Sequence, residues 1–232
     1  MSLEIIPVEG IGVVSPGDDL LTILSDALRP HRPANGDVIV VTHKIVSKAE
    51  GQVVSIEGDP EEFKRKLVES EAASIVRRRG DLIIAETKHG FICANAGVDR
   101  SNAAPDTMIL LPEDPDRSAR RLKHRFDHEF GVDLAVIISD TFGRPWRRGL
   151  TDVAIGLAGM RPILDLKGTK DWVGYELDVT EVSVADELAS AADLVMGKAS
   201  GIPAALIRGY RYQPAEGHAS DLIRPPSEDL FR

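Results

Sequence analysis

The chain has 232 residues, of which 43% are hydrophobic and 28% charged, and its formal net charge is −9. This balance is ordinary for a globular protein with a sizeable core, and the negative charge argues against binding to a nucleic-acid backbone. The sequence has no apolar run near the ~20 residues that span a bilayer, and its start lacks the basic residues of a signal peptide. Its single cysteine, Cys93, excludes an internal disulfide. We therefore expect a cytoplasmic protein without nucleic-acid or membrane partners.

Taken in chain order, the apolar patterns predict strands, amphipathic helices and polar loops. Strands are expected where short apolar runs lie between turn residues, at residues 3–8, 37–41, 52–56, 82–85, 91–94, 108–111, 134–138, 162–166, 177–179 and 204–207. Helices are expected where apolar residues recur at helical spacing, at residues 16–30, 60–79, 115–130 and 180–197. Gly10 and Gly12 resemble the start of a dinucleotide-binding fingerprint, but Ser15 stands where the third glycine belongs.

The order of these elements indicates the fold class. Helices and strands mix without a regular alternation, and several strands look hairpin-connected. This pattern favours an α+β fold with mixed, largely antiparallel sheets and flanking helices over a doubly wound fold. Because no internal repeat or low-complexity linker interrupts the chain, we expect a single unit over residues 1–232. Two subdomains are the alternative, and the sequence leaves their boundary open.

Three polar loops that follow apolar strands carry the residue types of a metal and phosphate site. They hold Lys44, Ser47 and Lys48 in the first, Asp99 and Asn102 in the second, and Asp140, Thr141, Arg144, Arg147 and Asp152 in the third. Carboxylates with a hydroxyl suit Mg²⁺ or Mn²⁺, whereas lysine and arginine neutralise phosphate. If the loops meet, they form a nucleotide-dependent site, although the chain has no P-loop sequence.

Each of these residues also has an ordinary structural interpretation. Asp99 and Asn102 are typical of turns, in which their side chains bond to nearby backbone. Lys44 and Lys48, four residues apart, fit a solvated helix face. Cys93 lies in a strand-like run and is expected to be a buried, unreactive thiol. Sequence alone does not decide between the site and these alternatives.

Longer motifs narrow the choice. In order, the chain contains IIPVEGIGVVSPGDDL, VTHKIVSKAEG, ETKHGFICANAGVDRSN, LLPEDPDRSARR, ISDTFGRPWRRGLTDVAIG, YELDVTEVSVADELASAADLVMGK and LIRPPSEDLF. Together they cover nearly the whole sequence, and they resemble the F420 γ-glutamyl ligase family. The resemblance is to the free-standing form, without the nitroreductase-like domain that follows in some bacterial members. It implies the F420 ligase-like fold and an intertwined homodimer.

The resemblance also implies an activity. Members of this family are GTP-dependent ligases that add L-glutamate to coenzyme F420-0, giving F420-1, and then a second glutamate through a γ-linkage. They use Mn²⁺ or Mg²⁺ and respond to K⁺. The partners that we expect are therefore small molecules, namely F420-0, L-glutamate and GTP.

The motifs transfer the family's functional residues to positions in this chain. Asp99, Asp140 and Thr141 resemble its metal ligands. The residues that resemble its GTP site are Ile11, Gly12, Val13, Val14, His43, Lys48, Asn102, Gly197, Lys198, Ala199, Ser200, Gly201 and Ile202. Two positions depart from the family pattern: His43 replaces a small polar residue, and Lys198 replaces the Gln or Glu that archaeal members offer to a second metal. A protonated lysine cannot ligate a metal.

A mechanism follows as a hypothesis from these residues. The γ-phosphoryl group of GTP passes to a carboxylate of F420-0, with charge from the metal and from Lys48 stabilising the transfer. Arg144, Arg147 and Arg148 would hold the acidic substrate, and the general base stays unassigned. Two rival hypotheses use the same loops. One is a metal-dependent phosphohydrolase or kinase, and the other is a dimer that binds GTP without cleaving it.

Overall fold

The central sheet is built from the most apolar runs of the sequence. The computed structural model describes residues 2–230. Five strands form this sheet in the order β1-β12-β2-β8-β9. Their bounds are Glu4–Pro7 for β1, Val38–Thr42 for β2, Ala135–Arg144 for β8, Arg147–Ala158 for β9 and Ala204–Arg208 for β12. Strands β2 and β8 run parallel, and the other neighbours run antiparallel.

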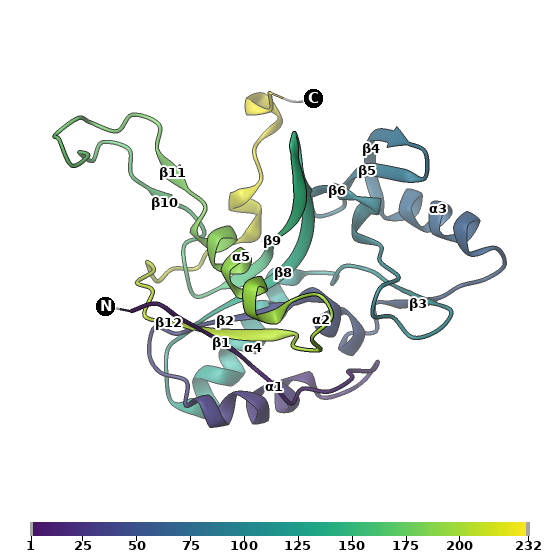
Figure 1. Ribbon diagram of the computed structural model, residues 1–232, viewed down its shortest axis with the longest axis horizontal. Coiled ribbons are helices and arrows are strands. Elements are labelled where there is room, and N and C mark those ends of the chain that lie inside the picture. Colours follow the sequence, from purple (N-terminus) through teal and green to yellow (C-terminus); the bar gives the residue numbers. More distant parts are fainter. Residues whose placement is uncertain (1, 231–232) are drawn as a thin grey trace.

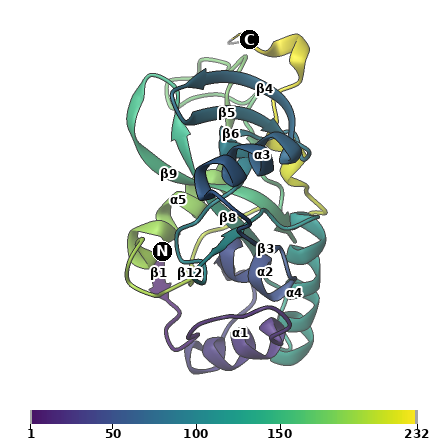
Figure 2. The ribbon, with the colours of Figure 1, turned by 90° about the vertical axis from the view of Figure 1, so that its right-hand side faces the viewer.

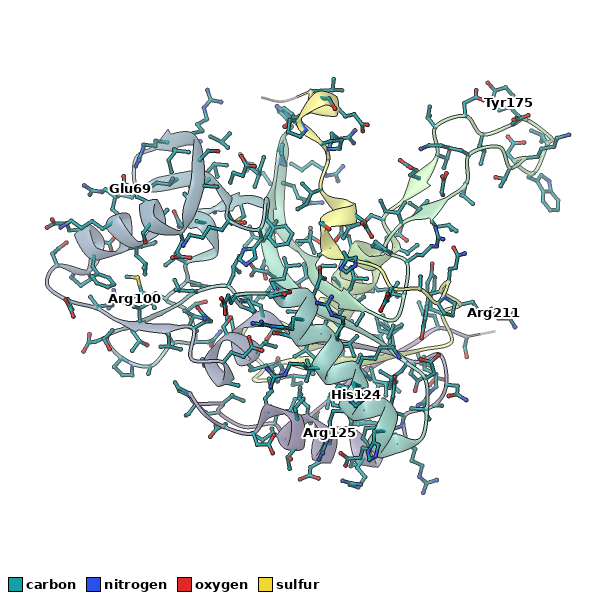
Figure 3. All side chains as sticks on the ribbon, turned by 180° about the vertical axis from the view of Figure 1, so that it is seen from behind. Glu69, Arg100, His124, Arg125, Tyr175 and Arg211 are labelled. Atoms are coloured by element: carbon teal, nitrogen blue, oxygen red, sulfur yellow. The ribbon has the colours of Figure 1, made fainter. Side chains whose placement is uncertain are left out.

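Helices cover both faces of this sheet. Helix α4 (Pro115–Phe130) and helix α5 (Val184–Met196) lie on opposite faces, and α1 (Leu20–Leu28) packs beside α4 (Figures 1 and 2). Seen from behind, α4 crosses the molecule with His124 and Arg125 along it (Figure 3). Because both faces are covered, the paired parts of β2 and β8 are buried: all of β2 except Thr42, and the first five residues of β8.

A smaller layer with its own hydrophobic cluster lies beside the main sheet. Its elements are β3 (Val53–Ser55), α3 (Pro60–Glu71), β4 (Ala72–Arg79), β5 (Leu82–Thr87), β6 (Ile92–Ala94) and β7 (Thr107–Ile109). Strands β4, β5 and β6 pair in that order, and β3 pairs with β7. Val68 of α3 packs with Ile83 and Met108 in the cluster. Figure 1 shows this layer on the right of the molecule.

The long helix expected at residues 60–79 is wrong in its second half. Helix α3 ends at Glu71, and the next eight residues form β4. Ile75 pairs with Ala85 and Arg79 with Leu82, so these residues contribute an edge strand to the small sheet. Helical spacing of apolar residues continued past Glu71, but pairing with β5 satisfies the backbone there, and tertiary context overrides local propensity.

An arm projects from the opposite side of the molecule. It leaves and rejoins the body through β10 (Leu164–Asp165) and β11 (Glu181–Val182), as Figure 1 shows at its upper left. The second strand therefore lies after residues 177–179, where it was expected. Trp172 on the arm is fully exposed, and Tyr175 lies near its end (Figure 3). Short 3-10 turns complete the fold at Arg29–His31, Asn95–Gly97, Ala219–Leu222 and Pro226–Glu228.

The predicted fold class is confirmed: the chain is mixed α+β, its sheets are largely antiparallel, and helices flank them. The homodimer stays a prediction. None of the helices within residues 2–230 has the length and apolar character needed to cross a bilayer.

Two local features of the fold differ from the polar loops predicted for the site, and both position polar residues; the first agrees with the helix that was the alternative for Lys44 and Lys48. Helix α2 (His43–Ala49) begins directly after β2, where a polar loop was expected. Strands β8 and β9 form one long hairpin, so the break expected at residues 143–145 is only its tight end. Arg144 pairs with Arg147 there, and Trp146 adopts a positive φ of 57° in the two-residue connection. Asp140 and Thr141 therefore lie within a strand and not in a loop.

Candidate functional site

A cleft of about 540 Å³ opens where the parallel pairing of β2 with β8 ends. Thr42 pairs with Ser139 at this edge, so His43 and Asp140 follow side by side. Carboxyl ends of parallel strands are a common position for ligand sites. The predicted residues that line the cleft are Gly12, Val13, Val14, His43, Lys48, Asn102, Asp140, Thr141, Gly197, Lys198, Ala199, Gly201 and Ile202. The structure thus brings together segments that are distant in the sequence.

A cross-strand pair forms one wall of the cleft. Thr141 of β8 lies opposite Asp152 of β9, and its hydroxyl donates to Asp152 Oδ1 over 2.7 Å. Asp152 is only 2% exposed, and its other oxygen accepts a hydrogen bond of 3.1 Å from Ser139 Oγ. Such a buried carboxylate requires donors around it, because an unpaired buried charge is costly. The cluster supplies them.

Lys198 completes this wall from the loop after α5. Its Nζ lies 2.6 Å from Asp152 Oδ1, 2.6 Å from Asp193 Oδ1 and 2.8 Å from Thr141 Oγ1. Burial lowers the pKa of Lys198, but hydrogen bonds to Asp152 and Asp193 outweigh burial and leave the pKa raised. The side chain therefore carries a firm positive charge among three oxygens.

The first turn of α2 contacts both predicted metal-binding carboxylates. His43 is buried, with Nε2 3.2 Å from Asp140 Oδ1 and Nδ1 3.3 Å from Ser47 Oγ. The next residue, Lys44, places Nζ 2.6 Å from Asp99 Oδ2. Successive residues of one helical turn therefore hold two carboxylates that come from different strands and loops.

Lys48 lies one turn further along α2 and lines the same cleft. Within the described residues no carboxylate lies close enough to form an ion pair with it. Burial, followed by the charge of Lys44, lowers the pKa of Lys48. A partly buried ammonium without a protein anion is a candidate for contact with an anionic ligand.

Five predicted site residues do not line the cleft. Asp99 lies next to it, bonded to Lys44 and to Ser101, whose backbone N–H donates to Oδ1 as in a turn. Burial raises the pKa of Asp99, but the bonds to Lys44 and Ser101 leave it lowered. Ile11 belongs to the core, and Ser200 Oγ donates to the carbonyl of Met196. These three shape the surroundings of the cleft.

The two arginines Arg144 and Arg147 lie at the exposed end of the β8–β9 hairpin. Arg144 donates to the backbone carbonyl of Arg148 over 2.8 Å, which closes the hairpin end. The expected cationic loop is thus a strand end, because the pairing of β8 with β9 continues to Arg144. Their role in holding substrate stays a prediction.

Sequence reasoning missed the part that Asp152, Asp193 and Ser139 play in this wall. Asp152 stood among the candidates of the third loop, but no role was assigned to it. Its alignment with Thr141 depends on the hairpin register, which is shifted by a bulge after Ile138. Asp193 lay within an expected helix, five residues before Lys198, and nothing in that spacing indicates a contact across the helix end.

The oxygens around the cleft suit a hard divalent ion. Within the described residues, no three His, Cys, Asp or Glu side chains cluster as a metal site by themselves. The predicted set relies on two carboxylates and a hydroxyl. Asp140 Oδ1 accepts from the backbone N–H of Thr141 over 2.7 Å, whereas Oδ2 has no hydrogen-bond donor among the described residues. A free carboxylate oxygen beside the Thr141 hydroxyl fits Mg²⁺ or Mn²⁺.

Comparison with known proteins now connects this geometry to a family. The family model described as F420-0:Gamma-glutamyl ligase matches residues 10–209. The chain belongs to this ligase family. The matched span includes every residue placed above in or beside the cleft.

Relatives within the ligase family cover the chain almost completely. "Coenzyme F420:L-glutamate ligase" of Methanothermobacter thermautotrophicus is 44% identical over 100% of both chains. The protein of the same name from Methanopyrus kandleri is 45% identical over 100% of this chain and 98% of its own. That from Methanocaldococcus jannaschii is 42% identical over 90% of each. The resemblance inferred from the sequence motifs is confirmed.

Proposed function

We propose that this chain is a GTP-dependent ligase that adds L-glutamate to coenzyme F420-0, giving F420-1 and then γ-linked F420-2. Membership of the ligase family and relatives named Coenzyme F420:L-glutamate ligase support glutamate ligation. The preference for GTP and the chemical route are the finer parts of the proposal. The preference for GTP is what the family resemblance implies, and the chemical route rests on the cleft and on the residue types that line it.

The observation that carries the proposal is the cleft's pattern of charge. Among residues 2–230 no carboxylate pairs with Lys48, whereas Lys44 and Lys198 are paired with Asp99 and Asp152. One unpaired ammonium beside a row of oxygen ligands suits a triphosphate, whose charge is shared between a cation and a bound metal. Because the net charge of the chain is −9, an unpaired cation in the cleft is a local feature of the site and does not follow from the overall charge.

An acyl phosphate is the proposed intermediate. A carboxylate is a poor electrophile, so a carboxylate oxygen of F420-0 first attacks the γ-phosphorus of GTP, and GDP leaves. The amine of glutamate then attacks the acyl carbon, a C–N bond forms, and the C–O bond to phosphate breaks. The amine loses a proton, for which we assign no base. Catalysis of phosphoryl transfer is mostly positioning and electrostatics, and Lys48 supplies charge at this point.

Asp99, Asp140 and Thr141 would hold the metal ion, Mn²⁺ or Mg²⁺. When bound, such an ion neutralises phosphate charge and polarises the transferring group. Asp140 offers Oδ2, and Thr141 offers its hydroxyl oxygen. Asp99 would exchange its contact with Lys44 Nζ, 2.6 Å away, for the ion. K⁺ is expected as a further ion, without assigned ligands.

The GTP site is proposed around the remaining cleft residues. They are Gly12, Val13, Val14, His43, Asn102 and the loop at residues 197–202. Ile11, in the core beside Gly12, and Ser200, which donates to the Met196 carbonyl, support the backbone of these two segments. Arg144 and Arg147 would hold the acidic substrate from the hairpin end. We also propose a homodimer, because the exposed Trp172 and Tyr175 give the arm an apolar surface of the kind that a second copy covers.

Mass spectrometry tests this function directly. F420-0 incubated with glutamate, Mn²⁺ and GTP should gain one and then two glutamates, with ATP giving little product. Phosphate release without glutamate would favour the phosphohydrolase or kinase alternative, and bound but intact GTP would favour the sensing dimer.

A pair of lysine variants connects that activity to the cleft. Lys48→Met should lower the rate roughly 100-fold, the size of effect seen when a charge-stabilising donor is removed. Lys66→Met is the matched control, because Lys66 lies on the surface of α3 and pairs with Glu62 over 2.8 Å. Equal rates for both variants would place the reaction elsewhere.

A further inference from the structure

Asp152 lies beside a predicted metal ligand without being one itself. It is 2% exposed, and its Oδ1 accepts from the Thr141 hydroxyl over 2.7 Å and from Lys198 Nζ over 2.6 Å. Its Oδ2 accepts from Ser139 Oγ over 3.1 Å. Both carboxylate oxygens are therefore occupied by protein donors, so this side chain acts on its neighbours and not on a ligand.

The hydrogen bonds of Thr141 fix the direction of its hydroxyl. A hydroxyl has one proton to donate and two lone pairs to accept with. The proton goes to Asp152 Oδ1, and one lone pair accepts from Lys198 Nζ over 2.8 Å. One lone pair remains, and Thr141 lines the cleft. Without Asp152 the hydroxyl would be free to rotate and to point its proton at an incoming cation.

Lys198 holds this arrangement in place from the far side. An ammonium has three N–H donors, and three protein oxygens lie within 2.8 Å of Nζ, on Asp152, Asp193 and Thr141. Nζ donates to Asp152 and Thr141 and forms an ion pair with Asp193, so its charge is held by protein groups. The same contacts tie the loop that begins at Gly197, where φ is +60°, to the β8–β9 hairpin.

We propose that Asp152 is a positioning residue, which orients the Thr141 hydroxyl so that its free lone pair faces the cation site, and that Lys198 anchors Asp152 and the 197–201 loop. This inference rests on the proposed function, in which Thr141 is a metal ligand. It gives roles to Asp152 and Asp193, and it assigns Lys198 to the protein framework and not to the nucleotide.

Measurements of metal affinity distinguish a positioning role of Asp152 from an effect of its charge alone. Residues that orient metal ligands typically change affinity 10–100-fold when they are mutated. Mn²⁺ binding to the full chain is measured by the loss of the free-ion electron paramagnetic resonance signal, with folding checked by circular dichroism. Asp152→Leu, which removes both carboxylate acceptors at similar volume, and Thr141→Val should each weaken Mn²⁺ binding by about tenfold or more.

The double variant is decisive. If Asp152 acts only through Thr141, Asp152→Leu combined with Thr141→Val should bind Mn²⁺ as Thr141→Val alone does, because coupled residues are not additive. Asp116→Leu is the matched control. Asp116 is a half-buried carboxylate that accepts from the Leu157 backbone N–H over 2.9 Å at the far end of β9, and it should leave affinity unchanged.

Two outcomes would overturn the inference. A further loss of affinity in the double variant, equal to that of Asp152→Leu alone, would show that Asp152 acts independently of Thr141, through its charge, and the proposed function would stand. Equal Mn²⁺ affinity of the unmodified protein and Thr141→Val would remove Thr141 from the metal site. That result would overturn both the positioning role and the metal assignment of the proposed function.

Discussion

Gly156 marks the point where the hairpin that carries the site packs against α4. A Cβ atom added to this glycine would lie 2.5 Å from the carbonyl carbon and oxygen of Pro115 and 2.6 Å from its Cβ. These are backbone and ring atoms, which cannot rotate away as the end of a long side chain would. Gly156→Ala therefore forces β9 away from the first turn of α4.

The structure allows the size of this effect to be worked out. Overpacking a buried site costs about 1–3 kcal/mol, and replacing glycine with alanine returns about 0.4–1 kcal/mol by restricting the unfolded chain. The expected net loss is about 1–2 kcal/mol in the free energy of unfolding. For a protein of this size, each kcal/mol lowers the melting temperature by about 2–4 °C.

Gly143 provides a matched control in the same hairpin. Its added Cβ would meet no heavy atom within 4 Å, and its φ is not in the left-handed region. Gly143→Ala should therefore be neutral or slightly stabilising. Urea unfolding should be followed by far-ultraviolet circular dichroism, because Trp146 and Trp172 are already exposed and their fluorescence would respond little to unfolding. Gly156→Ala with wild-type stability would refute the packing described for β9 and α4.

Three further predictions concern charge, reactivity and assembly. If Lys48 must be charged, the rate should fall on the alkaline side at a lower pH than an ordinary lysine would set, because burial and Lys44 lower the pKa of Lys48. In a pH–rate profile, Lys48→Arg should move this fall to higher pH, and an unmoved profile would exclude Lys48 as its source. Burial, aided by the charge of Asp140, raises the pKa of Cys93 from 9.0 to about 12, so the thiolate fraction of Cys93 is about 1,000-fold smaller than normal. Iodoacetamide should therefore label Cys93 far more slowly in folded than in urea-unfolded protein, and equal labelling rates would contradict its burial. Replacing Trp172 and Tyr175 with serine should convert a dimer into a monomer in light scattering, and a monomeric unmodified protein, or a variant that stays dimeric, would refute the role proposed for the arm.

The sequence was informative wherever a local pattern determined the structure. The helix at Pro115–Phe130 was predicted with its limits, because Asp114 caps its start and Gly131, at φ +68°, ends it. The apolar runs at residues 37–41 and 134–138 were predicted as strands, and they are the buried parallel pair β2 and β8. The polar residues that follow both strands do meet at one cleft.

Features that depend on long-range pairing were not predictable in the same way. Residues 72–79 have apolar residues at helical spacing, yet they pair with β5. The position of Asp152 opposite Thr141 follows from a hairpin register with a bulge, and a shift of one residue would turn it to the other face. Arg144 and Arg147 were expected in the site as members of the third polar loop. An extended strand rises about 3.3 Å per residue, which carries them away from it.

The central claim is that the cleft transfers the γ-phosphoryl group of GTP to a carboxylate of F420-0. Positional isotope exchange tests this step before glutamate takes part. GTP carrying ¹⁸O in the β–γ bridge should scramble its label into the β-nonbridging positions when enzyme, Mn²⁺ and F420-0 are present and glutamate is absent. Omitting F420-0 should abolish the exchange. An enzyme that forms F420-1 when glutamate is added, but shows neither exchange nor a hydroxamate after hydroxylamine trapping, would contradict the account.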